Sequence, residues 1–263
     1  MTVMSSQFRL AAILAIAALS WFACNKDPNA PKAAVTAGWT ATNGIDAPES
    51  TYLDLGSGFL FSSQVGGAPD AKDGNGRIVK MTADGTVVAA NWVTGLNAPK
   101  GLRSCNGTLW TADIDQVIGI DIATGTITSR VAVPGAKFLN DVACGGDGTV
   151  YVSDNVISQI IAVKDGTPSV FAEGEELLEW PNGVLVDGDR LIVGGWGKPP
   201  EINGHLFAID LKTKAKTLIA QMPVGQIDGV ESDGRGGFVV TDWMAGKIID
   251  RKSTRLNSSH VSE

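Results

Sequence analysis

Histidine is almost absent from this sequence, which has only His205 and His260 among its 263 residues. A hydrolase that uses a Ser-His-Asp triad or a histidine dyad needs an imidazole base at its site, and only His205 lies in the body of the chain. The chain also lacks Gly-x-Ser-x-Gly, a phosphate-binding Walker loop, a dinucleotide fingerprint and Cys-x-x-Cys. These absences argue against the corresponding enzyme classes.

Basic residues are few: 21 Lys and Arg face 28 Asp and Glu, and the formal net charge is −7. Because no basic cluster occurs in the body of the chain, nucleic acid is not an expected partner. Aromatic residues make up 6% and charged residues 19% of the sequence, whereas glycine is frequent, with 32 residues. This composition is typical of a turn-rich β protein and not of a helical bundle.

Long apolar runs are also missing, apart from residues 10–23, which follow Arg9 and end at Cys24. The run is too short to span a bilayer comfortably and has the flanks of a secretory signal. We expect residues 1–24 to be a signal of the lipoprotein type, lipidated at Cys24; a cleaved signal in which Cys24 has no role is the alternative. Residues 25–44 are polar and contain proline, which predicts a tether. The protein would then be exported to the periplasm or outer surface, with membrane contact only through a lipid anchor.

A short motif recurs along the rest of the chain. Its middle residues are separated by 51, 40, 42 and 46 positions, and they are Glu49, Lys100, Asn140, Asn182 and Asp228. Each motif is followed by an apolar stretch, a turn such as Asn106-Gly107 or Asp147-Gly148, and further strand-like segments. Four antiparallel strands in every unit predict an all-β fold with about five propeller blades in residues 45–249. A β-sandwich would not explain why the motif recurs at the same point of every unit.

Residues 250–263 break the repeat. They resemble the translation of a sequencing-adapter oligonucleotide, which predicts a non-native tail and the loss of a sixth blade; a genuine polar tail is the alternative. An unclosed ring would leave sheet faces and edges exposed.

The five motif residues are expected to meet, because the chain enters each propeller blade at its innermost strand. Two carboxylates, Glu49 and Asp228, and two amides, Asn140 and Asn182, would then surround the central channel. Such hard oxygen ligands suit Ca²⁺, with Zn²⁺, Mg²⁺ or Mn²⁺ as alternatives, better than they suit a thiolate or imidazole metal site. The sequence therefore predicts a divalent cation in the channel.

Four of these motifs resemble those of the senescence-marker-protein/gluconolactonase family of regucalcin-like six-bladed β-propellers. Glu49 precedes the first blade strand, Asn140 lies in Leu-Asn-Asp, Asn182 in Pro-Asn-Gly and Asp228 in Ile-Asp-Gly, in the family's chain order over residues 45–249. The resemblance implies that Glu49, Asn182 and Asp228 hold the metal and that Asn140 binds substrate. It further implies metal-dependent hydrolysis of a small lactone or ester, with Asp228 as the base. The alternative is a non-catalytic exported propeller that binds a protein, a glycan or a small ligand.

The chain departs from the family pattern at two positions. Phe138 stands two residues before Asn140, where family members often carry an arginine that grips a sugar acid, so a sugar-lactone substrate is less strongly implied. Lys100 occupies the channel position of the second blade. Its ammonium would bind an anionic part of the substrate, face solvent, or stand where the cation should be and replace it.

Cys105 and Cys144 lie one position apart in the repeat alignment, at the ends of the innermost strands of neighbouring blades. Adjacent inner strands would bring them within reach of each other outside the reducing cytoplasm. We expect a disulfide, with two buried thiols as the alternative.

Overall fold

The computed structural model describes residues 38–198, 200 and 203–252. The account below concerns the described residues of the unit Trp39–Glu263, one of two units into which the chain divides. The predicted signal with Cys24, and the tail after Lys252, lie outside the described residues. The compact unit begins at Trp39, six residues before the predicted start of the propeller. No helix among the described residues has the length and apolar character needed to cross a membrane.

Nineteen strands form five antiparallel sheets within the described residues. The first blade comprises β1 (Pro48–Asp54), β2 (Phe59–Gln64), β3 (Gly76–Thr82) and β4 (Val87–Leu96). The second comprises β5 (Pro99–Cys105), β6 (Thr108–Asp113), β7 (Gln116–Asp121) and β8 (Ile127–Ala132). The third comprises β9 (Leu139–Cys144), β10 (Val150–Asp154), β11 (Gln159–Lys164) and β12 (Thr167–Glu173). The fourth comprises β13 (Pro181–Asp187), β14 (Arg190–Gly195), β15 (Leu206–Asp210) and β16 (Lys216–Leu218), and the fifth comprises β17 (Ile227–Ser232), β18 (Gly237–Asp242) and β19 (Lys247–Lys252).

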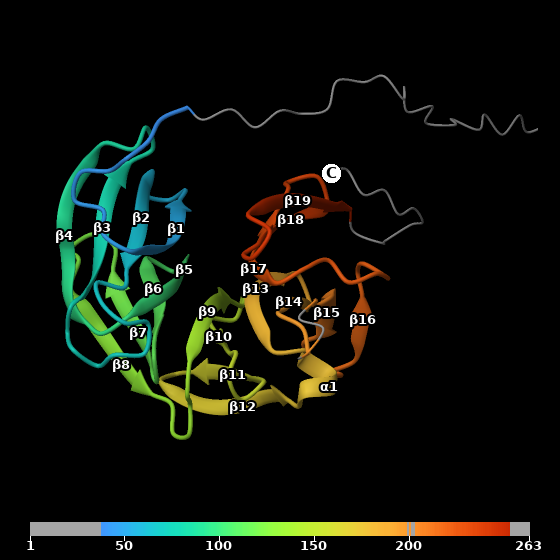
Figure 1. Ribbon diagram of the computed structural model, residues 1–263. Helices are drawn as coiled ribbons and strands as arrows, with labels where there is room; N and C mark the ends of the chain where they lie inside the picture. Colours follow the sequence, from blue (N-terminus) through green and yellow to red (C-terminus); the bar gives the residue numbers. More distant parts are fainter. Residues whose placement is uncertain (1–37, 199, 201–202, 253–263) are drawn as a thin grey trace, which may run out of the picture. The chain divides into compact units, whose positions relative to one another are not determined.

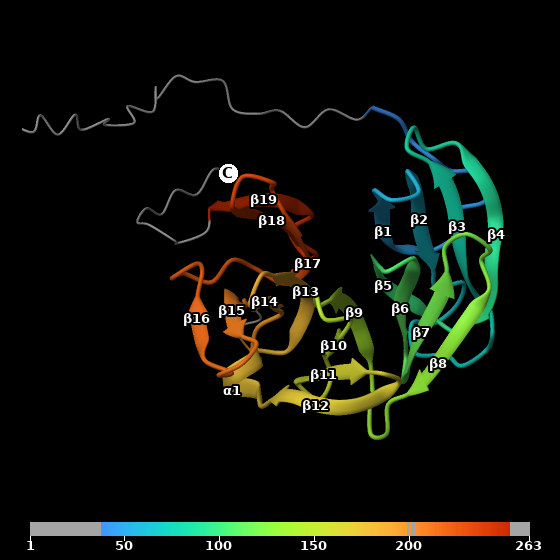
Figure 2. The same cartoon turned by 180° about the vertical axis from the view of Figure 1, so that it is seen from behind.

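The sheets follow one another around a common centre, with β1, β5, β9, β13 and β17 innermost (Figures 1 and 2). Within each sheet the strands pair in the order in which they occur along the chain. This is the arrangement of propeller blades. The predicted all-β propeller with about five blades is therefore confirmed.

Two elements differ from the sequence prediction. The strand β19 continues to Lys252, three residues beyond the expected end, because the β18–β19 ladder stays in register as far as the pair Gly237–Lys252. A one-turn helix, α1 (Glu175–Leu178), precedes the fourth blade and was not predicted. Four residues are too short to give a helical hydrophobic period.

The core lies between successive sheets. Phe61 and Ile78 of the first blade pack with Leu109 and Ile118 of the second, and all four are fully buried. Similar clusters join the second blade to the third and the third to the fourth. Burying one such side chain contributes about 1.5–3 kcal/mol. The contacts between blades thus hold the inner strands, and the side chains that they carry, in fixed positions.

Candidate functional site

Every innermost strand carries a β-bulge at the recurring motif. In β1 the register with β2 is interrupted between Pro48 and Thr51, so that Glu49 and Ser50 fall outside the regular pairing. Equivalent interruptions occur in the other four blades. A bulge bends its strand and turns its side chains in a new direction. The motif therefore recurs because each blade uses a bulge to direct a residue into the channel.

Hydroxyl groups on the second strands support three of these bulges. Each hydroxyl accepts a hydrogen bond from the backbone N–H of the second bulge residue, at 2.8–3.0 Å. The pairs are Ser50 N–H to Ser63, Asp141 N–H to Ser153, and Gly229 N–H to Thr241. These bonds satisfy backbone groups that the interrupted ladder leaves free.

Aspartates at the ends of two second strands hold the chain just before the bulge. Asp113 accepts the N–H groups of Asn97 and Ala98, the latter at 2.8 Å. In the next blade, Asp154 accepts the N–H of Lys137 at 2.7 Å and that of Phe138. Both carboxylates are fully buried. The segments that lead to Lys100 and Asn140 are thereby fixed to the sheet.

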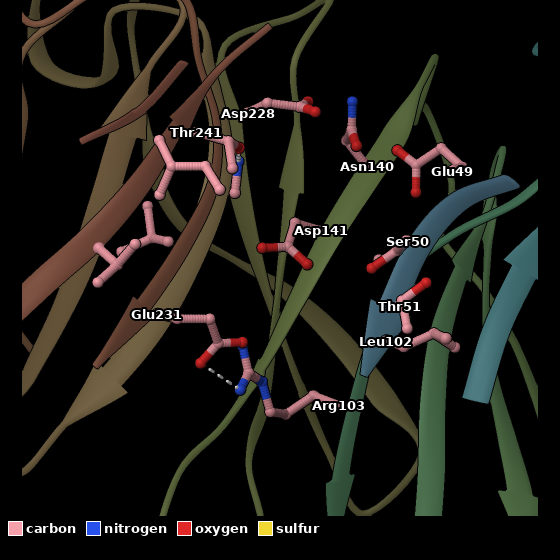
Figure 3. A pocket seen from close by; sticks show the side chains of 15 residues that line it. Glu49, Ser50, Thr51, Leu102, Arg103, Asn140, Asp141, Asp228, Glu231 and Thr241 are labelled. Atoms are coloured by element: carbon pink, nitrogen blue, oxygen red, sulfur yellow. Dashed lines mark hydrogen bonds and ion pairs between the residues drawn. The ribbon is translucent and has the colours of Figure 1, made fainter. Parts of the chain in front are cut away.

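The structure brings the five motif residues together at one cavity of about 510 Å³, lined by Glu49, Lys100, Asn140, Asn182 and Asp228 among others. Glu49, Asn140 and Asp228 also line a second cavity of about 390 Å³, so the three residues stand where the two cavities meet. Figure 3 shows these three side chains near one another among the residues that line the second cavity. The expected convergence on the channel is thus present.

Asn182 and Asp228 are in direct contact. Nδ2 of Asn182 donates to Oδ1 of Asp228 at 2.9 Å, and Oδ1 of Asn182 is buried with no hydrogen-bond partner. Burial raises the pKa of Asp228, and the hydrogen bond from Asn182 opposes this shift. The pair therefore presents an unpartnered amide oxygen next to a carboxylate that is more basic than usual.

Glu49 lines the channel. Two other acidic residues, Asp228 and Asp141, are near enough to affect its ionisation. Desolvation raises its pKa from 4.5 to about 8; the negative charges of Asp228 and Asp141 add to the shift, and the positive charge of Lys100 opposes it. A carboxyl group with this pKa keeps its proton at neutral pH unless a positive charge arrives. A cation bound here would supply that charge.

Lys100 is fully buried, with 2% of its surface exposed. Its Nζ donates to the carbonyl oxygens of Pro69 at 2.9 Å and Ala98 at 3.0 Å, and it lies 4.3 Å from the centre of the Phe138 ring. Burial lowers the pKa of Lys100, although Glu49 and Asp113 act in the opposite direction. The alternative in which Lys100 faces solvent is therefore wrong, because the bulge directs it inward.

The oxygen ligands at this cavity fit a hard cation only if amide oxygens contribute as well as carboxylates. Among the described residues, no group of three or more His, Cys, Asp or Glu side chains is arranged to hold a metal. Glu49 and Asp228 provide two carboxylates, and Asn182, whose Nδ2 contacts Asp228, provides the neutral oxygen Oδ1, which has no partner. Mixed carboxylate and carbonyl oxygens are the ligands that Ca²⁺ takes in proteins. These residues would hold such an ion.

Asp141 was missed by the sequence analysis. It is the second bulge residue of β9 and lines the 390 Å³ cavity. Its carboxylate accepts the N–H groups of Val142 and Val184, both at 2.8 Å. Desolvation raises its pKa to about 7, and the positive charge of Arg103 and the backbone hydrogen bonds oppose the shift. Regular strand alternation would point Asp141 away from the channel if Asn140 points into it; the bulge removes that alternation.

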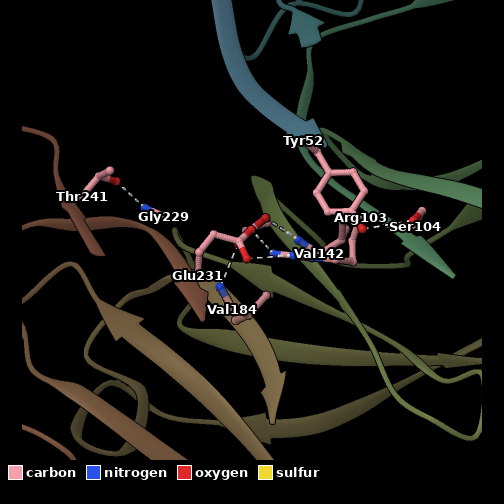
Figure 4. A network of polar contacts seen from close by, with 9 residues as sticks. Tyr52, Arg103, Ser104, Val142, Val184, Gly229, Glu231 and Thr241 are labelled. Atoms are coloured by element: carbon pink, nitrogen blue, oxygen red, sulfur yellow. Dashed lines mark hydrogen bonds and ion pairs between the residues drawn. The ribbon is translucent and has the colours of Figure 1, made fainter. Parts of the chain in front are cut away.

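Arg103 and Glu231 were also missed. Arg103 of the second blade and Glu231 of the fifth blade form an ion pair of 2.7 Å across the far end of the same cavity (Figure 3). The guanidinium of Arg103 also lies 5.0 Å from the ring of Tyr52, whose hydroxyl is 3.0 Å from that of Ser104 (Figure 4). Charged residues in strands are ordinarily exposed, and only the propeller arrangement places these two face to face.

A disulfide joins Cys105 and Cys144, whose Cα atoms are 6.2 Å apart. It links the ends of β5 and β9, the innermost strands of the second and third blades. The two cysteines and Arg103 line a third cavity of about 280 Å³. The disulfide therefore lies beyond Arg103. It takes no part in the ring of five motif residues around the channel, here called the motif ring.

The segment before Asn182 is held in an unusual backbone conformation. Glu179 and Trp180 have φ values of 53° and 55°, a region that side-chain-bearing residues seldom adopt. The Glu179 carboxylate contacts Nδ1 of His205 at 2.9 Å and Nζ of Lys216 at 2.7 Å. These contacts lower the pKa of Glu179, although burial acts against them. His205 thus anchors a loop and does not line the cavities described above.

No model of a known protein family matches the sequence, and no curated protein matches it. Among solved structures, the chain is similar to a catalytically inactive variant of virginiamycin B lyase from Staphylococcus aureus with quinupristin, with a TM-score of 0.60, 16% identity, and coverage of 80% of this chain and 68% of the lyase. The selenomethionine-substituted lyase gives a TM-score of 0.56, with 16% identity and coverage of 78% and 67%. A chain of a nidogen/laminin complex gives 0.50, with 13% identity and coverage of 73% and 90%. At these identities the likeness concerns the propeller fold alone.

Proposed function

We propose that this protein is a metal-dependent hydrolase of lactones or esters, similar to the gluconolactonase family. The observation that carries the proposal is the meeting of Glu49, Asn140, Asn182 and Asp228 at one cavity, with Oδ1 of Asn182 buried and unpartnered. Five bulges at equivalent points of five blades direct polar side chains into the channel, where Lys100, Asn140 and Asn182 are buried. Such groups are easier to explain by a ligand than by stability, because burying them is unfavourable.

In the proposed site, Glu49, Asn182 and Asp228 hold the cation, and Asn140 orients the substrate. A bound divalent cation would polarise the substrate carbonyl and stabilise negative charge on its oxygen. Asp228, whose pKa is raised by burial, takes a proton from the attacking water. The water oxygen bonds to the carbonyl carbon, the bond from that carbon to the ester oxygen breaks, and the leaving oxygen receives the proton. The products are a carboxylic acid and an alcohol, joined in one molecule when the substrate is a lactone.

The experiment combines cation binding with a substrate screen. Ca²⁺, Zn²⁺, Mg²⁺ and Mn²⁺ are titrated separately into protein freed of metal, and binding is followed by calorimetry. Each loaded form is then tested with aliphatic lactones, sugar lactones and aryl esters. The proposal expects binding of at least one cation and hydrolysis that disappears with a chelator. Binding of none of the four, or hydrolysis that persists in the chelator, would count against it.

A specific observation favours a second candidate, a propeller that binds a ligand without catalysis. Lys100 lines the same cavity as Glu49, and its positive charge interacts with that carboxyl group. A buried ammonium can replace a cation as the counter-charge of a carboxylate. Under this candidate no cation binds and no ester is hydrolysed in the native protein. An exported location, with lipid attachment at Cys24, suits either function and remains part of the proposal.

A further inference from the structure

Three aromatic side chains share the 510 Å³ cavity with the motif residues: Phe138, Trp196 and Trp243. Phe138 directly precedes β9, Trp196 directly follows β14, and Trp243 directly follows β18. The rings of Trp196 and Trp243 are 5.5 Å apart between centroids and tilted by 41°. We call these three side chains the aromatic wall. It brings residues of three different blades to one cavity.

The rest of the cavity outside the motif residues is also largely apolar. Pro48, Val65 and Pro69 contribute no side-chain hydrogen-bonding group. Asn155 is polar, but its Nδ2 already donates to the carbonyl oxygen of Trp180 at 3.2 Å. A sugar acid would need partners for several hydroxyl groups, because buried polar groups without partners are costly. Apart from Oδ1 of Asn155, the polar side-chain groups that remain belong to the five motif residues.

The backbone at two residues of the wall is held in place without a ligand. The backbone N–H of Trp196 donates to the carbonyl of Trp180 at 2.9 Å, and that of Trp243 donates to the carbonyl of Gln226 at 3.0 Å. Trp243 nevertheless leaves 60% of its surface exposed. A large aromatic side chain that is anchored but uncovered gains stabilisation when a flat apolar group covers it. Preorganisation of this kind reduces the entropy lost on binding.

We infer that the aromatic wall binds a flat apolar group of the substrate, so that the substrate class is aromatic or similarly apolar esters and lactones and not polyhydroxylated sugar acids. The statement about esters and lactones rests on the proposed function. The preference of the wall for an apolar ring does not rest on that function, since it follows from the cavity lining. A cavity of 510 Å³ is large enough for a bicyclic ring system beside the motif residues.

Two lactams test this preference, because a lactam keeps the shape of a lactone and resists hydrolysis. Oxindole carries a fused aromatic ring, and glucono-δ-lactam carries hydroxyl groups instead. Binding of each is measured by calorimetry with the native chain, with and without Ca²⁺. We expect oxindole to bind more tightly than the sugar lactam. Equal binding of the two, or tighter binding of the sugar lactam, would overturn the inference.

Variants of Trp243 connect that binding to the wall. Trp243→Ala should weaken oxindole binding roughly tenfold, whereas Trp243→Phe should keep most of it. Trp39→Ala is the matched control, because Trp39 is also exposed, at 47%, and does not line the cavity. Circular dichroism of each variant checks that the fold is retained. Unchanged oxindole affinity in folded Trp243→Ala would contradict the inference, and Trp243→Phe provides the comparison if the alanine variant is unstable.

The outcomes for the wall and for the proposed function can be told apart. Oxindole binding that depends on Trp243, in a protein that hydrolyses no ester or lactone, would support the wall and refute the hydrolase. Chelator-sensitive hydrolysis of glucono-δ-lactone, in a protein that does not bind oxindole, would support the hydrolase and refute the wall.

Discussion

Nδ2 of Asn182 lies 2.9 Å from Oδ1 of Asp228, although the two residues are 46 positions apart and belong to neighbouring blades. The contact directs the amide nitrogen toward the carboxylate and leaves the amide oxygen, Oδ1, free and buried. One hydrogen bond between blades thus orients both proposed ligands. It also makes each residue's contribution dependent on the other.

Asp228→Asn tests this pair. The substitution preserves the shape of the side chain but removes a charge, and a hydrogen bond or contact to a charged group is worth about 1.5–3 kcal/mol. We expect Ca²⁺ affinity to fall roughly ten- to a hundredfold and hydrolysis to be lost. Calorimetry measures the first effect and the substrate screen the second. Asp187→Asn, at the Asp187–Arg190 ion pair outside the cavity, is the control, and unchanged cation affinity in Asp228→Asn would remove Asp228 from the site.

The stability of the protein without metal should depend on pH through Glu49. Its pKa is about 8 in the folded chain against an ordinary value of 4.5, so the folded state retains a proton that the unfolded state releases. The stabilisation linked to this proton is present below about pH 4.5 and is lost as the pH rises toward about 8. Glu49→Gln removes this loss. The variant should melt at a higher temperature than the native protein at pH 8, and at a similar temperature at pH 4.5.

Thermal unfolding followed by circular dichroism in a chelator, across this pH range, measures the effect. Some pH dependence should remain in Glu49→Gln, because the pKa of Asp141 is also raised, to about 7. Glu173→Gln is the control, since Glu173 contacts Gln159 on the surface. If the melting temperature depends on pH in the same way in Glu49→Gln and in the native protein, Glu49 has no raised pKa. Ca²⁺ should stabilise the native protein more than Glu49→Gln, because the ion compensates the repulsion between the carboxylate of Glu49 and those of Asp228 and Asp141.

The repeat was visible in the sequence because turns and bulges require particular residues. Asn106 and Gly107 both adopt positive φ, as a two-residue hairpin turn demands, and such pairs mark the blades in the sequence. The recurring motif gave the positions of the bulges, but the sequence did not show that the strands are bulged there. Fold and motif ring were therefore predictable, since both depend on local backbone chemistry repeated along the chain.

The second cavity was not predictable in the same way. Asp141 faces it because a bulge interrupts the alternation of β9, and Gly101 leaves the space, since a Cβ there would lie 2.1 Å from Oδ1 of Asp141. Arg103 and Glu231 meet across the channel over 128 positions. Nothing local in the sequence connects them. Contacts between distant blades depend on how the sheets are arranged around the channel, which the repeat alone does not specify.

The disulfide should contribute substantially to stability. It closes a loop across a sequence separation of 39 residues, and cross-linking a loop of this size lowers the entropy of the unfolded chain by an amount worth about 4 kcal/mol. The paired variant Cys105→Ser with Cys144→Ser should therefore lower the free energy of unfolding in guanidinium by about 2–4 kcal/mol. The single variants should lose about as much, because each breaks the same bond. A double variant as stable as the oxidised native protein would contradict this expectation.

Lys100 decides between the two proposed functions. Lys100→Met keeps most of the side-chain length but removes the ammonium, so the carbonyls of Pro69 and Ala98 lose a donor and the free energy of unfolding should fall by about 1–3 kcal/mol. The positive charge beside Glu49 disappears as well, so Ca²⁺ should bind several-fold more tightly, as measured by calorimetry. Lys137→Met, at an exposed lysine in the loop before β9, should change neither property.

Ca²⁺ binding by the native chain, measured beside Lys100→Met, separates the candidates. If the native chain is a hydrolase, it binds Ca²⁺ already and the variant binds it better. If the ammonium of Lys100 replaces the cation, the native chain binds no Ca²⁺ and the variant acquires a site from Glu49, Asn182 and Asp228. Weaker binding in the variant would contradict both, because it would mean that the ammonium assists the cation, contrary to the repulsion between like charges.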